Sequence, residues 1–173
     1  MSATTDNMLE LMTPVLIEFG KTVHICQIFE SSLCLLMSLM AHGSSGGEDG
    51  AFQASWDFHS KKTLGALLNS LREKIEVSSE FDGFLDEGVK SRNKVIHGFL
   101  IHNAMRLADP KGRLEVEQEL VVIRNEIKSR DVVVNKLIDA VLKQYGTSNE
   151  RLKRNADRLW EHLNPETPSS GAH

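Results

Sequence analysis

The residues best suited to chemistry lie in one short run, SRNKVIHGF, which spans residues 91–99. Arg92 supplies a guanidinium, which binds phosphate oxygens through paired hydrogen bonds. His97 supplies an imidazole, the side chain that most often acts as a general acid or base near neutral pH. Asn93, next to the arginine, adds an amide that can orient its neighbours. A phosphate-binding group close to a proton-transferring group predicts chemistry on a phosphodiester.

In a continuous helix these three side chains would not share one face. Asn93 and His97 are four residues apart and lie on the same face, so Asn93 can position His97. Arg92 lies about 140° around the helix from His97 and has to reach toward it. One copy of the set has a single histidine, which cannot easily act as base and acid in the same step. We therefore expect a two-fold dimer that places two arginines and two histidines in one cleft.

Such a cleft would be sufficient to cleave RNA. One histidine would deprotonate the ribose 2′-hydroxyl, and the other would protonate the leaving 5′-oxygen. The two arginines would hold the phosphate and stabilise the charge that develops on it. The alternative interpretation is structural, with His97 as a histidine hydrogen-bonded at a helix interface.

Glu30 interrupts an otherwise apolar pattern. Between residues 19 and 40, apolar side chains recur at alternating spacings of four and three, as in a helix that faces other helices. Glu30 occupies one position of this series, and Arg92 interrupts the corresponding series of a second helix. Because an unpaired buried charge is costly, the two residues predict an ion pair between the helices. The pair could orient Arg92 for function, or it could only hold the helices together.

Basic residues outside the motif have two interpretations. Lys90 and Lys94 flank it and could contact RNA phosphates, or they could belong to a solvated helix face. Residues 124–158 carry nine Lys and Arg against five Asp and Glu. That stretch could form a stripe facing RNA, or it could be the outer face of a helix.

The run RNKVIHGF in a helical chain resembles the motif of the HEPN superfamily. The hallmark of that family is an arginine, a short spacer and a histidine, often with a polar residue beside the arginine. The run CQIFESSLCLL, residues 26–36, is similar to the opening helix of these proteins, in which a glutamate often faces the motif. The resemblance covers about residues 14–145. It implies Arg92 and His97 as the catalytic pair, Asn93 as a supporting residue and Glu30 as an orienting partner.

The same resemblance implies a homodimer and, in many members, a metal-independent endoribonuclease of toxin–antitoxin or other defence systems. RNA is then the expected substrate and an antitoxin protein the expected partner. Several toxins of the family have a tyrosine two residues after the histidine, which a partner nucleotidyltransferase modifies. Phe99 occupies that position here, and the only tyrosine is Tyr145, so we expect no silencing through that residue. The alternative is a non-catalytic HEPN-like module that dimerises and binds RNA, a nucleotide or a partner protein.

The rest of the sequence predicts only helices. Thr13 and Pro14 indicate a helix start, and further helices are expected over about residues 62–76, 80–103 and 114–145. The alternation typical of strands is nearly absent. We expect an all-α fold, an antiparallel four-helix bundle over residues 13–146, after a flexible N-terminus at 1–12. A short C-terminal helix at 147–164 and a disordered tail at 165–173 would follow.

Composition indicates one compact domain, with 173 residues of which 40% are hydrophobic. The net charge of −4 argues against a large cationic surface for nucleic acid but allows a local one. Cys26 and Cys34 are eight residues apart in one expected helix, too far for a disulfide, and indicate a reducing compartment. No apolar leader or spanning run is visible, so we expect a cytoplasmic protein without membrane contact. No ligand cluster accompanies His97 and His102, so we expect no metal, and no motif predicts a cofactor.

Overall fold

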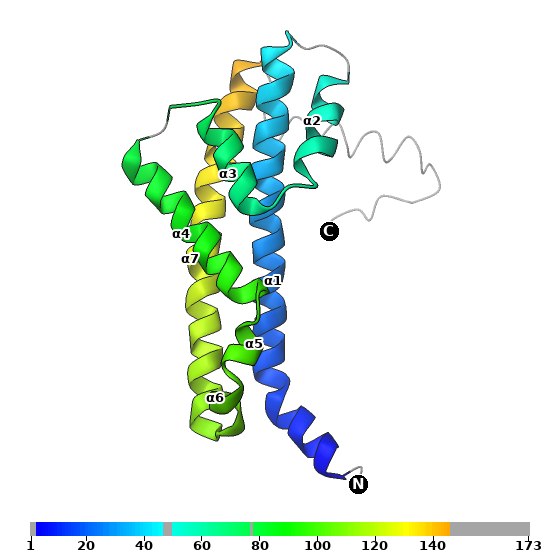
Figure 1. The fold of residues 1–173 in the computed structure, drawn as a ribbon, viewed down its shortest axis with the longest axis vertical. Coiled ribbons are helices and arrows are strands. Elements are labelled where there is room, and N and C mark those ends of the chain that lie inside the picture. Colours follow the sequence, from blue (N-terminus) through cyan, green and yellow to red (C-terminus); the bar gives the residue numbers. More distant parts are fainter. Residues whose placement is uncertain (1–2, 47–49, 77, 146–173) are drawn as a thin grey trace, which may run out of the picture.

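The chain forms two long parallel helices with shorter helices along one side (Figure 1). The structure is a computed structural model that describes residues 3–46, 50–76 and 78–145, without the side chains of residues 3–9. Helix α1 (Ala3–Ser44) and helix α7 (Pro110–Gln144) lie side by side. Every regular element in this part of the chain is a helix, which confirms the expected all-α class.

Five shorter helices connect the two long ones. They are α2 (Ala51–His59), α3 (Leu64–Arg72), α4 (Ser79–Ile96), α5 (Phe99–His102) and α6 (Ala104–Ala108). Helix α2 packs on α1, and α4 contacts both α1 and α7, across which it runs obliquely in Figure 1. Because the two long neighbouring helices run in the same direction, the expected antiparallel four-helix bundle is not confirmed.

Side-chain caps fix where three helices begin. Thr63 and Ser78 cap α3 and α4, because each side chain accepts a hydrogen bond from the backbone N–H three residues further on. Asp109 caps α7 in the same way, and Pro110 supplies the fixed φ that suits a first helical turn. Helix α7 therefore begins at Pro110, earlier than the expected start near residue 114.

Helix α1 begins at Ala3 and not at the predicted Thr13–Pro14 cap, so Pro14 lies inside the helix. A proline there lacks the N–H for one intrahelical hydrogen bond and crowds the preceding turn, which bends the helix. In Figure 1 the N-terminal part of α1 leaves the axis of the remainder. Most of the N-terminal segment expected to be flexible is thus helical. The expected C-terminal helix and tail, residues 147–173, lie outside the described residues.

The core is a seam between α1 and α7 that α3 and α4 close on one side. Helix α7 contributes four apolar residues spaced by seven, of which three are buried and Val141 is partly buried: Leu120, Ile127, Val134 and Val141. Half of the predicted apolar stripe of α1 is also buried: Cys26, Leu33 and Met37. The apolar side of α3 adds four buried leucines: Leu64, Leu67, Leu68 and Leu71. Burial of each such large side chain stabilises the fold by about 1.5–3 kcal/mol relative to exposure.

Helix α1 is long and apolar enough over Glu10–Ser44 to cross a bilayer, by length and composition alone. The core helix of a water-soluble domain passes the same test. Here α1 packs along α7, and it forms ion pairs with other helices through Glu18 and Glu30. The expected cytoplasmic location stays a prediction.

Candidate active site

Glu30 and Arg92 form the ion pair that their positions in the sequence predict. Arg92 Nε donates to Glu30 Oε1 and so joins α4 to α1 across 62 residues of sequence. The Arg92 side chain is 16% exposed and the Glu30 side chain 30% exposed. The pair is therefore shielded from most, but not all, of the solvent.

A break in the helix after Ile96 brings His97 to Arg92. Helix α4 ends there, His97 has φ −99° and ψ 57°, and Gly98 follows with φ +99°. Glycine adopts this left-handed conformation readily because it has no Cβ. His97 Nε2 consequently lies 3.4 Å from Arg92 Nη1. The continuous helix predicted over residues 80–103 is thus wrong, and the separation of about 140° that it implied does not apply.

The Asn93 side chain contacts Arg92 and not His97. Asn93 Oδ1 accepts a hydrogen bond of 3.0 Å from Arg92 Nη1. The link from Asn93 to His97 runs through the backbone, where the His97 N–H donates to the Asn93 carbonyl at 2.9 Å. Glu30 and Asn93 therefore hold the guanidinium between them, and the guanidinium contacts the imidazole.

The contact between Arg92 and His97 indicates which imidazole nitrogen carries no proton. A guanidinium can only donate, so a hydrogen bond at this contact requires Nε2 of His97 to accept, with the proton of a neutral ring on Nδ1. A neutral imidazole with a lone pair at Nε2 can act as a general base. His97 and Asn93 are both exposed, so a substrate can reach them from solvent. We name this set of Glu30, Arg92, Asn93 and His97 the arginine–histidine cluster.

Lys90 and Lys94 contact carboxylates and not the arginine–histidine cluster. Lys90 Nζ lies 2.8 Å from Glu87 Oε1, and Lys94 Nζ lies 2.7 Å from Glu119 Oε1. Burial alone would raise the pKa of Glu119, but hydrogen bonds from Lys94 and Arg106 outweigh that effect and lower the pKa. Both lysines thus belong to an ion-paired helix face, and their contact with RNA stays a prediction.

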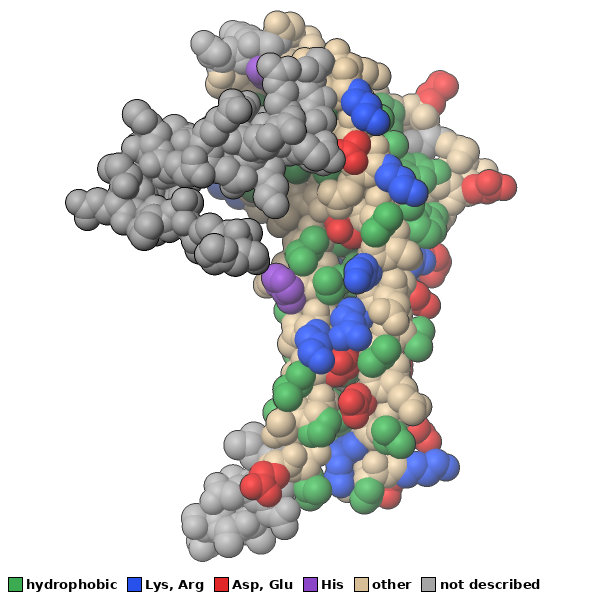
Figure 2. Space-filling view, turned by 180° about the vertical axis from the view of Figure 1, so that it is seen from behind, with side chains coloured by type: hydrophobic (Ala, Val, Ile, Leu, Met, Phe, Trp, Pro, Cys, Tyr) green, Lys and Arg blue, Asp and Glu red, His purple; other side chains and the backbone are tan. Residues whose placement is uncertain are grey.

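A second ion pair crosses the core away from the motif, and sequence reasoning missed it. Arg124 of α7 contacts Glu18 of α1, whose side chain is 8% exposed, and Lys21 lies 3.4 Å from the same carboxylate. Figure 2 shows acidic and basic side chains interspersed on the face behind that of Figure 1, without a continuous cationic surface. A charge in the α1 seam is therefore not by itself a sign of function. The histidine in contact with Arg92 is what distinguishes the Glu30 pair.

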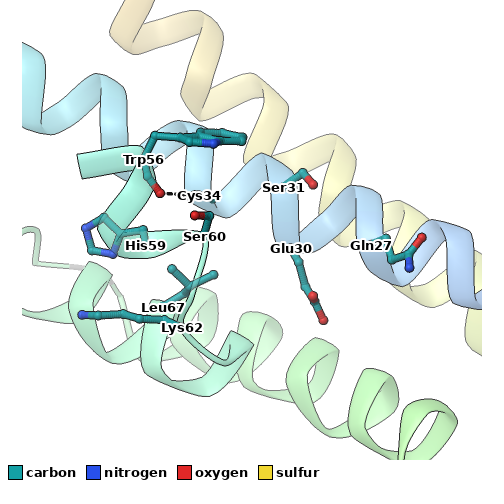
Figure 3. A pocket seen from close by; sticks show the side chains of 9 residues that line it. All are labelled: Gln27, Glu30, Ser31, Cys34, Trp56, His59, Ser60, Lys62 and Leu67. Atoms are coloured by element: carbon teal, nitrogen blue, oxygen red, sulfur yellow. Dashed lines mark hydrogen bonds between the residues drawn. The ribbon is translucent and has the colours of Figure 1, made fainter. Parts of the chain in front are cut away.

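A hollow of about 200 Å³ lies beside Glu30, between α1, α2 and the first turn of α3 (Figure 3). Trp56 and His59 of α2 line it, together with residues of α1 and of the segment before α3. Burial, reinforced by the charges of Lys62 and Lys74, lowers the pKa of His59. No sequence motif predicts this hollow, because its lining comes from three separate segments.

Within the described ranges, no three His, Cys, Asp or Glu side chains gather as ligands of one metal ion. Comparison of the chain with protein-family models, curated proteins and solved structures finds no significant match. Function has to be argued from the arginine–histidine cluster itself.

Proposed function

We propose that this chain is a HEPN-like, metal-independent endoribonuclease that acts as a homodimer. The observation that carries the proposal is the contact between His97 Nε2 and the Arg92 guanidinium, which Glu30 and Asn93 hold in place. It combines an anion-binding group with a general base in one solvent-accessible cluster. In this proposal α1, α3, α4 and α7 are the four helices of the bundle, and the other helices are additions to it.

One chain supplies one histidine to the cluster, so the second proton transfer requires a second copy. Three large apolar side chains near His97 support a contact between copies: Ile96 is 37% exposed, Ile101 78% and Met105 88%. Apolar side chains grouped and exposed in this way are typical of surfaces that a partner covers. A two-fold contact through residues 96–105 would bring two arginine–histidine clusters to one cleft.

In that cleft His97 of one copy takes the proton of the ribose 2′-hydroxyl at Nε2. The 2′-oxygen then forms a bond to the adjacent phosphorus, and the bond from phosphorus to the 5′-oxygen breaks. The protonated His97 of the other copy gives its proton to the leaving 5′-oxygen. The two Arg92 side chains stabilise the charge on the non-bridging oxygens. The products are a 2′,3′-cyclic phosphate and a 5′-hydroxyl.

A nuclease of this kind would act on RNA of the cell that makes it, as a cytoplasmic toxin or defence effector restrained by an antitoxin protein. Phe99 is buried and has no hydroxyl, so the restraint would work by binding and not by modification at that position. Expression of the wild type should inhibit growth, and His97→Ala should relieve the inhibition.

The direct test is cleavage of total cellular RNA in the presence of a chelator. His97→Ala should reduce the rate by about 100-fold or more, the contribution expected of a general base. His24→Ala is the matched control, because His24 is also an exposed histidine but lies on α1 outside the cluster. Ile101→Asp should convert the dimer to a monomer in analytical ultracentrifugation and abolish cleavage.

Two results would overturn the proposal. A folded dimer that binds RNA, a nucleotide or a protein without cleaving RNA would indicate the non-catalytic module instead. Cleavage that persists in the monomeric Ile101→Asp variant would show that one copy is sufficient.

A further inference from the structure

The hollow beside Glu30 opens next to the arginine–histidine cluster. Glu30 belongs to both, because it lines the hollow and its carboxylate holds Arg92. Figure 3 shows Glu30 extending from α1 toward α4, with Trp56 across the hollow from it. A molecule in the hollow would therefore contact Glu30, whose carboxylate holds the guanidinium that is proposed to bind the scissile phosphate, although Arg92 itself does not line the hollow.

The size and lining of the hollow fit a planar ring with polar edges. Its volume of about 200 Å³ exceeds the roughly 150 Å³ of an engineered protein cavity that holds benzene. Trp56 offers an aromatic surface, and stacking on Phe52, with centroids 6.4 Å apart and planes at 16°, holds the indole in place. Gln27 and Ser31 also line the hollow, and neither side chain has a hydrogen-bond partner among the described residues. An amide and a hydroxyl are thus available to the edge of a base.

The charges around the hollow favour an anion. The carboxylate of Glu30 is neutralised by Arg92. Lys62 is half-buried, donates to the neutral Ser70 hydroxyl at 2.9 Å and lies 4.1 Å from the centroid of the Phe58 ring, but it has no carboxylate partner in the part of the chain that the structure describes. A half-buried ammonium without a counter-ion attracts a negatively charged ligand. An aromatic surface, exposed polar groups without protein partners and a cation without a carboxylate partner together match a nucleotide, which carries both a base and a phosphate.

We propose that this hollow binds one nucleotide of the RNA substrate, adjacent to the phosphate that is cleaved. The base lies against Trp56 with its edge toward Gln27 and Ser31, and the phosphodiester continues past Glu30 to Arg92 and His97. The inference rests on the proposed nuclease function and adds to it a subsite for the base.

Trp56 can report binding directly, independently of cleavage. The chain has two tryptophans, so Trp160→Phe leaves Trp56 as the only one. In that background, uridine monophosphate and a short uridine oligonucleotide with a non-cleavable 2′-O-methyl backbone should quench the fluorescence saturably, whereas inorganic phosphate should not. Ser31→Phe should fill the hollow from its exposed side and weaken binding roughly tenfold or more, in line with loss of one stacked base. Ser129→Phe, at an exposed serine of α7, should bind as the parent does.

The possible outcomes test the base-binding subsite and the proposed nuclease function independently. Absence of saturable quenching, or equal affinity in Ser31→Phe and its parent, would overturn the subsite even if the protein cleaves RNA. Quenching by the mononucleotide but not by the oligonucleotide would also overturn it, because the ligand would then be a free nucleotide. Oligonucleotide binding that Ser31→Phe weakens, in a protein that cleaves no RNA, would support the binding site and overturn the nuclease.

Discussion

Replacement of Glu30 by glutamine tests the ion pair on which the arginine–histidine cluster depends. Glutamine keeps the shape and one neutral oxygen, but it removes the charge that balances Arg92. Breaking a fully buried pair costs about 3–5 kcal/mol, and breaking an exposed pair costs about 0–1 kcal/mol. The side chains of Arg92 and Glu30 are 16% and 30% exposed, which places the expected loss between these limits, at about 2 kcal/mol.

Thermal unfolding followed by circular dichroism measures that loss. In a domain of this length, 1 kcal/mol corresponds to about 2–4 °C, so Glu30→Gln should lower the melting temperature by roughly 4–8 °C. The helical spectrum at 20 °C should not change, since α1 and α4 keep their apolar contacts. Glu87→Gln is the matched control on the same helix as Arg92, because its pair with Lys90 is solvent-exposed, and its melting temperature should not differ measurably from that of the wild type.

A double-mutant cycle isolates the pair from other effects of each substitution. Once Glu30 is glutamine, Arg92→Gln no longer leaves a carboxylate unpaired, so the two losses should sum to more than that of the double variant. The proposed RNA cleavage should also be slower in Glu30→Gln, because the guanidinium loses one of the two side chains that hold it. Additive losses, or a melting temperature equal to that of the wild type, would refute the coupling between these residues.

Two substitutions and one labelling experiment probe the rest of the fold. Gly88→Ala would gain about 1 kcal/mol in helix propensity, but its Cβ would lie 2.6 Å from Arg130 Cδ and 3.1 Å from the buried Phe29 ring. Urea denaturation should therefore show a free energy of unfolding that is lower by about 1–2 kcal/mol. A higher free energy of unfolding would contradict this packing. The pKa of Glu119 is lowered from its ordinary value of 4.5, so its ionised carboxylate stabilises the fold above that pH, and this stabilisation is lost as the pH falls below it. The stability of Glu119→Gln should therefore decline less steeply than that of the wild type between about pH 5 and pH 3. An unchanged slope would contradict the role of the Lys94 and Arg106 contacts. Burial and the charge of Glu30 raise the pKa of Cys26 to about 11, so about one thiol in a thousand is ionised at pH 8, and Ellman's reagent should modify Cys26 only after unfolding.

The ion pair between Glu30 and Arg92 could be predicted from the sequence because leaving either charge buried and unpaired would be costly. An apolar stripe that carries one acidic residue, on a helix expected to face another stripe with one basic residue, leaves few ways to satisfy both charges. Glu30 and Arg92 indeed meet. The same reasoning did not find Glu18 and Arg124, because the series predicted from residue 19 onward omits position 18, which the structure buries against α7.

The approach of His97 to Arg92 could not be predicted, because it depends on the backbone angles of two residues. A glycine within an apolar helical pattern costs only about 1 kcal/mol, so the pattern through Ile96 and Phe99 favoured an uninterrupted helix. The structure ends α4 there. Helix α2 could not be predicted either, since nine residues around Trp56 are too few to establish a helical period.

Substitution of Gly98 alone could separate His97 from Arg92. With any L-amino acid there, the left-handed backbone would be strained, and a helix that ran on would swing the imidazole out of reach of the guanidinium. The residue with no side chain therefore determines the site as much as the residues that carry charge. A descendant of this protein could keep all four polar groups and still be inert after one substitution of Gly98.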